Sequence, residues 1–434
     1  MDKMADVLGR AGAWCGQNKY LSAIKNAFQN FMPLTIAGAI GVLWCNVLVN
    51  DQTGLGLFFK PIMALDFLNP AFQAVNFCTI SCITVGITLG IAQEIGVWNM
   101  GAEKAGYIPG LVGLAAWLSV TNTSHMVEGA KEAFTGIAGN ELGATGLFTG
   151  MIIGVLSVEL FCFFEKQDAL KIKMPEQVPP GVARAFEVLV PATITLIITA
   201  CIGSACYNLT GLYLNDVIKN GIQGPLGAVG ATIPGVMIIY LVIMLFWLVG
   251  IHGNNMLSAV KEALFTPLAL ENVEKFNKGE KPTNIINMYA LQMWGDFGGS
   301  GVTIGLVIAI MIFGKREDNK AIASLSLVPG LFNINETVTF GIPMVLNPIL
   351  GIPFVVAPLI TIIIGYVLTV IGFCPVACLT VPWTTPPIVF GFLATGANVM
   401  GAVTQAILIV VSTVIYVPFL IAYEKYQNKQ AAEA

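Results

Sequence analysis

Long apolar runs without charge alternate along this chain with shorter segments that hold most of its charged residues. About 20 apolar residues suffice for a helix to cross the hydrocarbon core of a bilayer. The pattern predicts an all-α polytopic membrane protein with about ten transmembrane helices and re-entrant hairpins. Crossings are expected near 26–50, 67–93, 105–124, 142–164, 188–209, 226–250, 300–314, 349–372 and 399–423.

Composition agrees with this pattern. Of the 434 residues, 56% are hydrophobic and only 11% are charged, with a mean hydropathy of +0.78. Soluble domains have about 25% charged residues. The formal net charge of −4 offers no basic face for a phosphate backbone, so we expect no nucleic-acid partner. The cysteines lie mostly in apolar runs and form no CxxC pair, so neither a metal site nor another cofactor is expected.

Basic residues flank the apolar runs in the first 25 residues, in the loop at 165–187 and in the tail after 423. Positive charge flanking membrane helices marks the cytoplasmic side. We therefore predict that both termini are cytoplasmic and that residues 1–25 form an amphipathic segment on that surface.

The loop at 165–187 is also the best domain boundary, because its prolines and Gly181 interrupt any helix. The chain is predicted to divide into a first half at 1–180, a connecting span and linker at 181–225, and a second half at 226–434.

One stretch does not follow simple alternation of crossings. A crossing at 300–314 would place the basic loop KREDNK, 315–320, on the outside. Either the polar interval 251–296 contains another crossing, or a segment there enters and leaves by the same face. Broken backbone at membrane depth is tolerated where it lines a cavity, and the glycines and prolines here favour the second alternative.

Glu336 is the strongest candidate functional residue. Residues 321–423 contain no Lys, Arg, Asp or His and only this one Glu, within a stretch interrupted by Pro and Gly. An ionisable group inside a membrane protein indicates function by default, so we expect Glu336 to face a cavity and accept a proton. The alternative is a structural carboxylate that caps a broken helix.

His252 is the second candidate. It lies between Gly250 and Gly253, directly after a long apolar run, and Asn254 follows. Flanking glycines let backbone turn closely around a ligand, and imidazole can hydrogen-bond a hydroxyl group. A buried structural histidine at a helix end is the alternative.

Aromatic and amide side chains near these residues suit a carbohydrate. Trp247, Trp294 and Trp383 offer flat faces for the C–H faces of a sugar, while Asn254 and Asn335 can bind its hydroxyl groups. Membrane tryptophans are also common interfacial anchors, and for each one singly that alternative stays open.

Six stretches of the chain are similar to one known family. They are AIKNAFQNFMPLTIAGAI, LGATGLFTGMIIG, FWLVGIHG, FGGSGVTIGL, VPGLFNINETVTFGIPMVLNPILGIPFVVAP and VPWTTPPIVFGFLATG. They resemble the membrane-embedded IIC component of the lactose/cellobiose (diacetylchitobiose) class of bacterial phosphoenolpyruvate-dependent phosphotransferase systems. One departure is Thr337, which stands where the family usually has Pro after the Glu.

The resemblance implies a homodimer in the bacterial cell membrane. Its N-terminal half would be a scaffold that forms the dimer interface, and its C-terminal half, with two re-entrant hairpins, would hold the sugar. Glu336 and His252 match the family residues that contact the sugar hydroxyl that becomes phosphorylated. The phosphoryl donor would be the phosphocysteine of a IIB protein, charged by IIA, and both are expected to be separate polypeptides.

The expected function is uptake of a sugar, such as the β-linked disaccharides cellobiose or lactose or an N-acetylated analogue, with phosphorylation of its 6-hydroxyl during alternating access. The chain would then be the transport component of a protein-phosphocysteine:sugar phosphotransferase. An ion-coupled secondary transporter with Glu336 as proton carrier is the alternative from another class. A substrate-sensing membrane receptor is a third.

Overall fold

The computed structural model describes Arg10, Trp14 and residues 17–51, 55–125, 134–175, 177–225, 230–342 and 344–433. The amphipathic segment predicted at 1–25 lies largely outside these residues. Two compact units are present, the first made of 17–38 and 74–228, and the second of 39–73 and 229–434. Almost all of the predicted second half, 226–434, lies in the second unit, together with 39–73.

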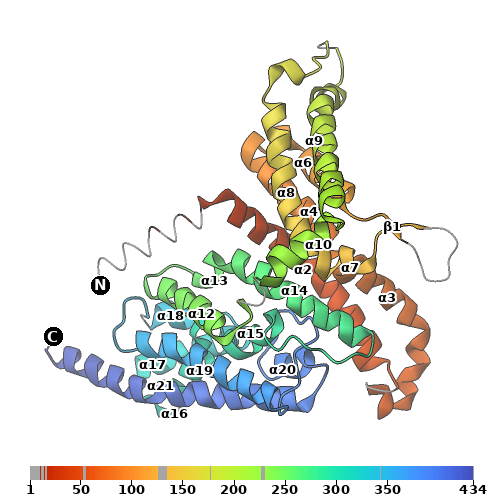
Figure 1. Cartoon of the computed structure of the whole chain (residues 1–434). Coiled ribbons are helices and arrows are strands. Elements are labelled where there is room, and N and C mark those ends of the chain that lie inside the picture. The colour runs from red at the N-terminus through yellow and green to blue at the C-terminus, as the bar shows by residue number, and fades with distance from the viewer. Residues whose placement is uncertain are drawn as a thin grey trace. The chain divides into compact units, whose positions relative to one another are not determined.

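Four apolar helices, α4, α6, α8 and α9, pack into a bundle in the first unit (Figure 1). Small residues let their backbones approach closely: a Cβ atom on Gly113 of α6 would overlap Ala92 of α4, and one on Gly150 of α8 would overlap Thr88. Such contacts are typical of helix packing in membranes. The elements here are η4 (Ile80–Cys82), α4 (Ile83–Met100), α5 (Ala102–Ala105), α6 (Ile108–Val120), β1 (Ser124–His125), β2 (Phe134–Thr135), α7 (Gly139–Leu142), α8 (Ala144–Glu165), η5 (Asp168–Leu170), α9 (Pro180–Thr210), α10 (Leu214–Ile218) and η6 (Lys219–Gln223).

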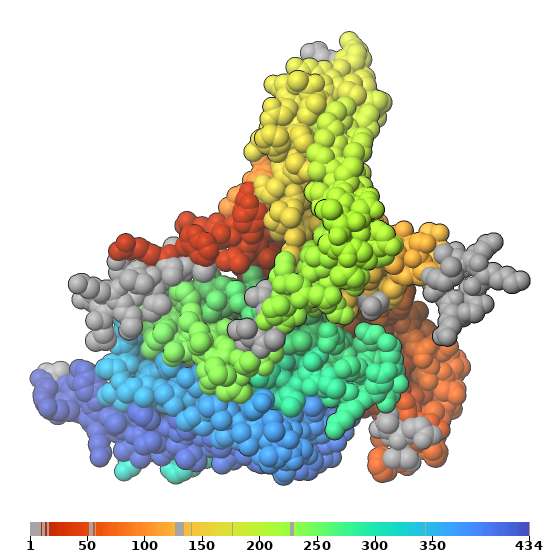
Figure 2. Space-filling view, viewed as in Figure 1, coloured from red at the N-terminus to blue at the C-terminus, as the bar shows by residue number. Residues whose placement is uncertain are grey.

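The second unit is built around one apolar core that includes Tyr240, Trp294, Phe354 and Tyr416. Helix α21 packs against α16 and α19, and the surfaces of α19 and α21 adjoin as two parallel bands (Figures 1 and 2). Its elements are η1 (Trp44–Leu48), η2 (Leu55–Leu57), η3 (Lys60–Leu68), α12 (Ile233–Leu248), α13 (Gly253–Met256), α14 (Ser258–Asn277), α15 (Met288–Gly295), η7 (Ser300–Val302), α16 (Ile304–Phe313), α17 (Glu317–Leu331), α18 (Glu336–Gly341), α19 (Gly351–Val370), α20 (Val389–Ala394) and α21 (Val399–Glu433). The chain passes between the units within α2 (Lys19–Leu43) and α3 (Asn69–Cys78).

Within the described residues, six helices are long and apolar enough to cross a membrane, and one bent pair raises this to seven. Two shorter apolar helices are α6 and α12. The prediction of an all-α polytopic membrane protein is confirmed. The count of about ten crossings stays a prediction.

The bent pair consists of residues 288–302 and α16, which meet at an angle of 60°. The bend is made possible by Gly298, Gly299 and Gly301, whose φ angles are +69°, +87° and +78°. Side chains rarely adopt this left-handed region, and a Cβ atom on Gly301 would also overlap the Phe354 ring. The polar interval 251–296 therefore contains α14 and leads through α15 into a broken helix.

Candidate functional site

His252 lies at a break between two helices of the second unit. Helix α12 ends at Leu248, the chain turns at Gly250 with a φ of +81°, and His252 caps the N-terminus of α13. Its Nδ1 atom accepts a hydrogen bond from the backbone N–H of Asn255 at 3.2 Å. Because Nδ1 is the acceptor, a neutral imidazole carries its proton on Nε2.

Glu336 is the first residue of the short helix α18, and its carboxylate faces that Nε2 atom. The Oε1 atom of Glu336 lies 3.8 Å from Nε2 of His252, and the two side chains are 47% and 37% exposed. This separation exceeds a direct hydrogen bond. A hydroxyl oxygen about 2.8 Å from both atoms fits between them, accepting from Nε2–H and donating to the carboxylate. The structure thus brings together the two residues predicted to act on a sugar hydroxyl.

Trp247 lies behind His252. The ring centroids of the two residues are 4.5 Å apart, and the indole is only 2% exposed. The rings of Phe340 and Phe354 lie 6.5 and 6.4 Å from that of Trp247. In this conformation, the tryptophan predicted to stack on sugar forms an aromatic wall that holds the imidazole.

Asn333 joins the Glu336 segment to two other loops. Its side-chain oxygen accepts from the backbone N–H of Gly298 at 2.6 Å, and its Nδ2 donates to the carbonyls of Trp383 and Thr385. Asn333 has a φ of +63°, which Asn tolerates better than most residues. The glycine-rich bend and the VPWTTPP loop are thereby fixed beside Glu336.

The asparagines predicted to bind sugar are engaged in hydrogen bonds within the protein. Asn335 is 4% exposed and donates to the backbone carbonyl of Ser300 at 2.7 Å. Asn254 donates to the Ser300 hydroxyl at 2.9 Å and to the Asp296 carboxylate at 3.4 Å. Both amides connect site-bearing segments to each other.

The remaining two predicted tryptophans differ in exposure. Trp383 is 44% exposed, so a large part of this residue is uncovered. Trp294 is 1% exposed, and a Cβ atom on Gly365 of α19 would overlap its ring. Trp294 thus belongs to the core of the second unit, whereas Trp383 has a free surface for a ligand.

The sequence pattern did not single out Lys261 and Asp296, which form a largely buried ion pair next to Asn254. Their Nζ and Oδ2 atoms are 2.8 Å apart, and their side chains are 8% and 17% exposed. The only sequence signal was an aspartate inside the apolar run ALQMWGDFGG. Which lysine pairs with this aspartate depends on tertiary structure.

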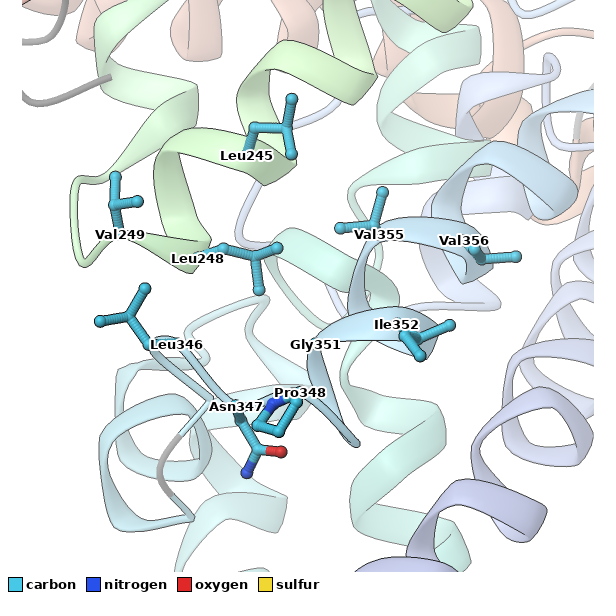
Figure 3. Close-up of a pocket in the computed structure, with 10 residues that line it drawn as sticks. All are labelled: Leu245, Leu248, Val249, Leu346, Asn347, Pro348, Gly351, Ile352, Val355 and Val356. Carbon is cyan, nitrogen blue, oxygen red and sulfur yellow. The ribbon is translucent and has the colours of Figure 1, made fainter. Parts of the chain in front are cut away.

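An apolar cavity of about 340 Å³ borders the end of α12, close to His252, and the loop that follows α18 (Figure 3). It is lined from the end of α12 by Leu245, Leu248 and Val249, from the loop after α18 by Leu346, Asn347 and Pro348, and from α19 by Gly351, Ile352, Val355 and Val356. The single polar side chain of this lining, Asn347, accepts from the backbone N–H groups of Ile349 and Leu350. Sugar hydroxyls would find few partners here, so the polar candidate site is the one between His252 and Glu336.

Residues 25–358 match the family model described as the phosphotransferase system EIIC component. The chain belongs to the EIIC family. The oligo-beta-mannoside-specific EIIC component of Bacillus subtilis is 33% identical over 429 residues, which cover 98% of this chain and 94% of that protein. The lactose-specific EIICB component of Staphylococcus aureus is 33% identical over 421 residues, which cover 94% of this chain and 69% of that protein.

The fold is shared as well. The crystal structure of ChbC, the IIC component of an N,N′-diacetylchitobiose-specific phosphotransferase system, superposes with a TM-score of 0.88 at 29% sequence identity, covering 97% of both chains. EIIC components are membrane permeases that work with sugar and with IIA and IIB partner proteins. This EIIC chain is therefore a multi-pass membrane protein that couples sugar uptake to phosphorylation.

Proposed function

We propose that His252 and Glu336 bind the sugar hydroxyl that receives the phosphoryl group, and that this is the 6-hydroxyl of a β-linked disaccharide. The observation that carries the proposal is the 3.8 Å gap between the Nε2 atom of His252 and the Glu336 carboxylate. Relatives named for oligo-β-mannoside, lactose and diacetylchitobiose support this substrate class.

The two residues have different roles in this proposal. Since Nδ1 of His252 is occupied by the Asn255 amide, its Nε2–H donates to the hydroxyl oxygen and holds it in place. Glu336 accepts the proton of the hydroxyl as general base. The oxygen then forms a bond to phosphorus while the bond between phosphorus and the IIB cysteine sulfur breaks, and the thiolate leaves with the electron pair.

Product release follows from charge. The sugar phosphate has nearly two negative charges at neutral pH. Once Glu336 has released the proton that it accepted, its carboxylate lies beside the new phosphate ester, and like charges repel. A site that holds a neutral sugar therefore binds the product less tightly, which favours its release to the cytoplasm.

Trp383 is proposed to stack on one sugar ring, because its indole is 44% exposed and its loop is tied to the Glu336 segment by Asn333. For Trp247, Trp294, Asn254 and Asn335, the hydrogen bonds and burial support a role in holding the site residues rather than a direct sugar contact.

The assembly is proposed to be a homodimer with both termini in the cytoplasm, in which 1–180 provides the scaffold and 226–434 carries the sugar across. A phosphorylated IIB protein docks on the cytoplasmic face. The basic residues of the first 25 positions and of the tail after 423 support this orientation.

Glu336→Gln tests the proposal directly, because glutamine keeps the size of the side chain and removes the base. In inside-out and right-side-out vesicles, phosphorylated IIB would be supplied at the cytoplasmic face of the membrane together with a labelled disaccharide. The sugar phosphate that forms would be measured. We expect the variant to bind sugar within about fivefold of the native protein, because one hydrogen bond contributes about 1 kcal/mol. Phosphorylation should fall by about 100-fold or more.

Glu274→Gln is the matched control, because this exposed carboxylate on α14 forms its ion pair with Lys278 at the surface. Phosphorylation by Glu336→Gln at the native rate would refute the base role. Uptake driven by a pH gradient alone, without sugar phosphate, would instead identify an ion-coupled transporter, and binding without accumulation would identify a receptor.

A further inference from the structure

A buried polar network surrounds the Lys261–Asp296 pair in the second unit. Besides its 2.8 Å contact with Asp296, the Lys261 ammonium donates to the Asn254 side-chain oxygen at 3.1 Å. The Tyr240 hydroxyl, from a fully buried side chain, donates to Oδ2 of Asp296 at 2.8 Å. Both charges are therefore compensated by close partners.

This network does not have the character of a simple stabilising contact. Removing an ammonium and a carboxylate from water costs several kcal/mol per ion, and a hydrophobic pair of similar volume is often equally stable or more stable. A buried ion pair is more readily explained where it fixes one geometry among several.

The geometry that it fixes is that of the candidate site. Asn254 lies two residues after His252, and it bridges the Lys261–Asp296 pair to the Ser300 hydroxyl. The backbone carbonyl of the same Ser300 accepts from Asn335, the residue directly before Glu336. Two hydrogen bonds that meet at Ser300, one to its hydroxyl and one to its backbone carbonyl, thus connect the His252 loop to the Glu336 segment through the glycine-rich bend.

We propose that Lys261 and Asp296 are positioning residues for phosphoryl transfer, which set the separation of His252 and Glu336 by fixing Asn254 and Ser300. The proposal rests on the proposed function of that site. Neither residue touches the sugar. Loss of the pair therefore lets the two site residues shift relative to each other, which slows the chemical step more than it weakens sugar binding.

The test compares sugar affinity with the rate of phosphorylation in the full-length protein, with diacetylchitobiose, cellobiose and lactose as probes. The main variant is Lys261→Met combined with Asp296→Asn, because removing both charges leaves no unpaired buried ion. We expect sugar affinity within about threefold of native. The phosphorylation rate at saturating sugar should fall about 100-fold, as for a misplacement of reacting groups by about 1 Å.

Two further variants separate positioning from folding. Lys261→Arg keeps the positive charge and its bonds to carboxylate and amide oxygens, so it should recover most of the rate. Ser300→Ala removes one hydrogen bond of the chain without leaving a buried charge, so the folded protein should bind sugar normally and phosphorylate about threefold to tenfold more slowly. The control is Lys278→Met with Glu274→Gln, which removes an exposed 2.6 Å pair from the same helix and should change neither quantity.

Three results would overturn the proposal. One is a native phosphorylation rate in the double variant. Another is a parallel loss of affinity and rate that Lys261→Arg does not reverse, which would indicate a structural pair only. If the double variant does not fold, a native phosphorylation rate in Ser300→Ala would overturn the proposal. If the native protein phosphorylates sugar no faster than Glu336→Gln, the proposed function itself is refuted. Failure of the positioning role and failure of the proposed function can therefore be told apart.

Discussion

At the scale of single residues, the two ring nitrogens of His252 have different neighbours: Nδ1 accepts from the Asn255 backbone, and Nε2 faces Glu336. The glycines that flank His252 and its place after an apolar run indicate a bend near a ligand. They do not reveal which ring nitrogen is free, because that depends on the 3.2 Å hydrogen bond from the Asn255 backbone to Nδ1. One nitrogen caps a helix and the other faces Glu336, so the helix-end role leaves Nε2 available for the proposed contact with a hydroxyl.

The two nitrogens can be separated by substitution. In His252→Asn, the side-chain oxygen can replace Nδ1 as the N-cap acceptor, but no group reaches the position of Nε2. We expect a folded protein whose sugar affinity is about threefold to tenfold lower, because one hydrogen bond to the hydroxyl is lost. Calorimetric titration of the purified protein with a β-linked disaccharide would measure this affinity. An unchanged affinity would show that Nε2 does not contact the sugar.

The tryptophans mark a limit of sequence-based prediction. Residue type indicates a large flat side chain but not how much of it is exposed. Trp294 is 1% exposed and Trp383 is 44% exposed, although both lie in Gly- or Pro-rich segments. Burial depends on which helices cover each ring, which local pattern does not contain. The same reason kept Lys261 and Asp296 from being recognised as a pair.

At the scale of elements, the apolar runs predict the long helices well. Helices α8 (Ala144–Glu165) and α19 (Gly351–Val370) begin and end within a few residues of the expected crossings at 142–164 and 349–372. For the polar interval 251–296, the sequence allows either another crossing or a re-entrant segment, and the interval runs into the broken segment at 288–313. Its 60° bend contains Gly298, Gly299 and Gly301, which all have positive φ, and Gly301 packs against the Phe354 ring, a tertiary contact.

Thr337 provides a prediction about the start of α18. It is the second residue of this helix, where the backbone N–H has no partner within the helix, and its side chain is exposed. Proline is tolerated in a first helical turn. We therefore expect Thr337→Pro, which restores the residue usual in the family, to keep phosphorylation within about threefold of native.

Thr339→Pro is the contrasting variant. The backbone N–H of Thr339 donates to the Asn335 carbonyl at 2.9 Å, and its side chain is buried. Loss of this bond costs about 3 kcal/mol or more and distorts the Glu336 segment. Phosphorylation assays on both variants should separate them by at least tenfold, and equal activities would contradict the placement of α18.

At the scale of the whole chain, the loop KREDNK is joined to the C-terminal helix. The Glu424 carboxylate of α21 accepts from the backbone N–H of Lys315 at 2.9 Å, from that of Arg316 at 3.3 Å and from the side chain of Asn319 at 3.2 Å. Glu424 is 6% exposed. The loop and the end of α21 therefore lie at the same end of the second unit, a relation that counting crossings along the sequence left unresolved.

This relation predicts the topology of both segments. If the tail after 423 is cytoplasmic, the basic loop at 315–320 is cytoplasmic too, as the positive-inside rule requires. Lys320→Cys and Lys429→Cys place thiols at positions whose side chains are 39% and 77% exposed. A membrane-impermeant maleimide should label neither in intact right-side-out vesicles and both after permeabilisation, relative to the unsubstituted chain. Labelling of one position alone from outside would contradict the Glu424 contact, whereas labelling of both would keep that contact and reverse the orientation of the whole second unit.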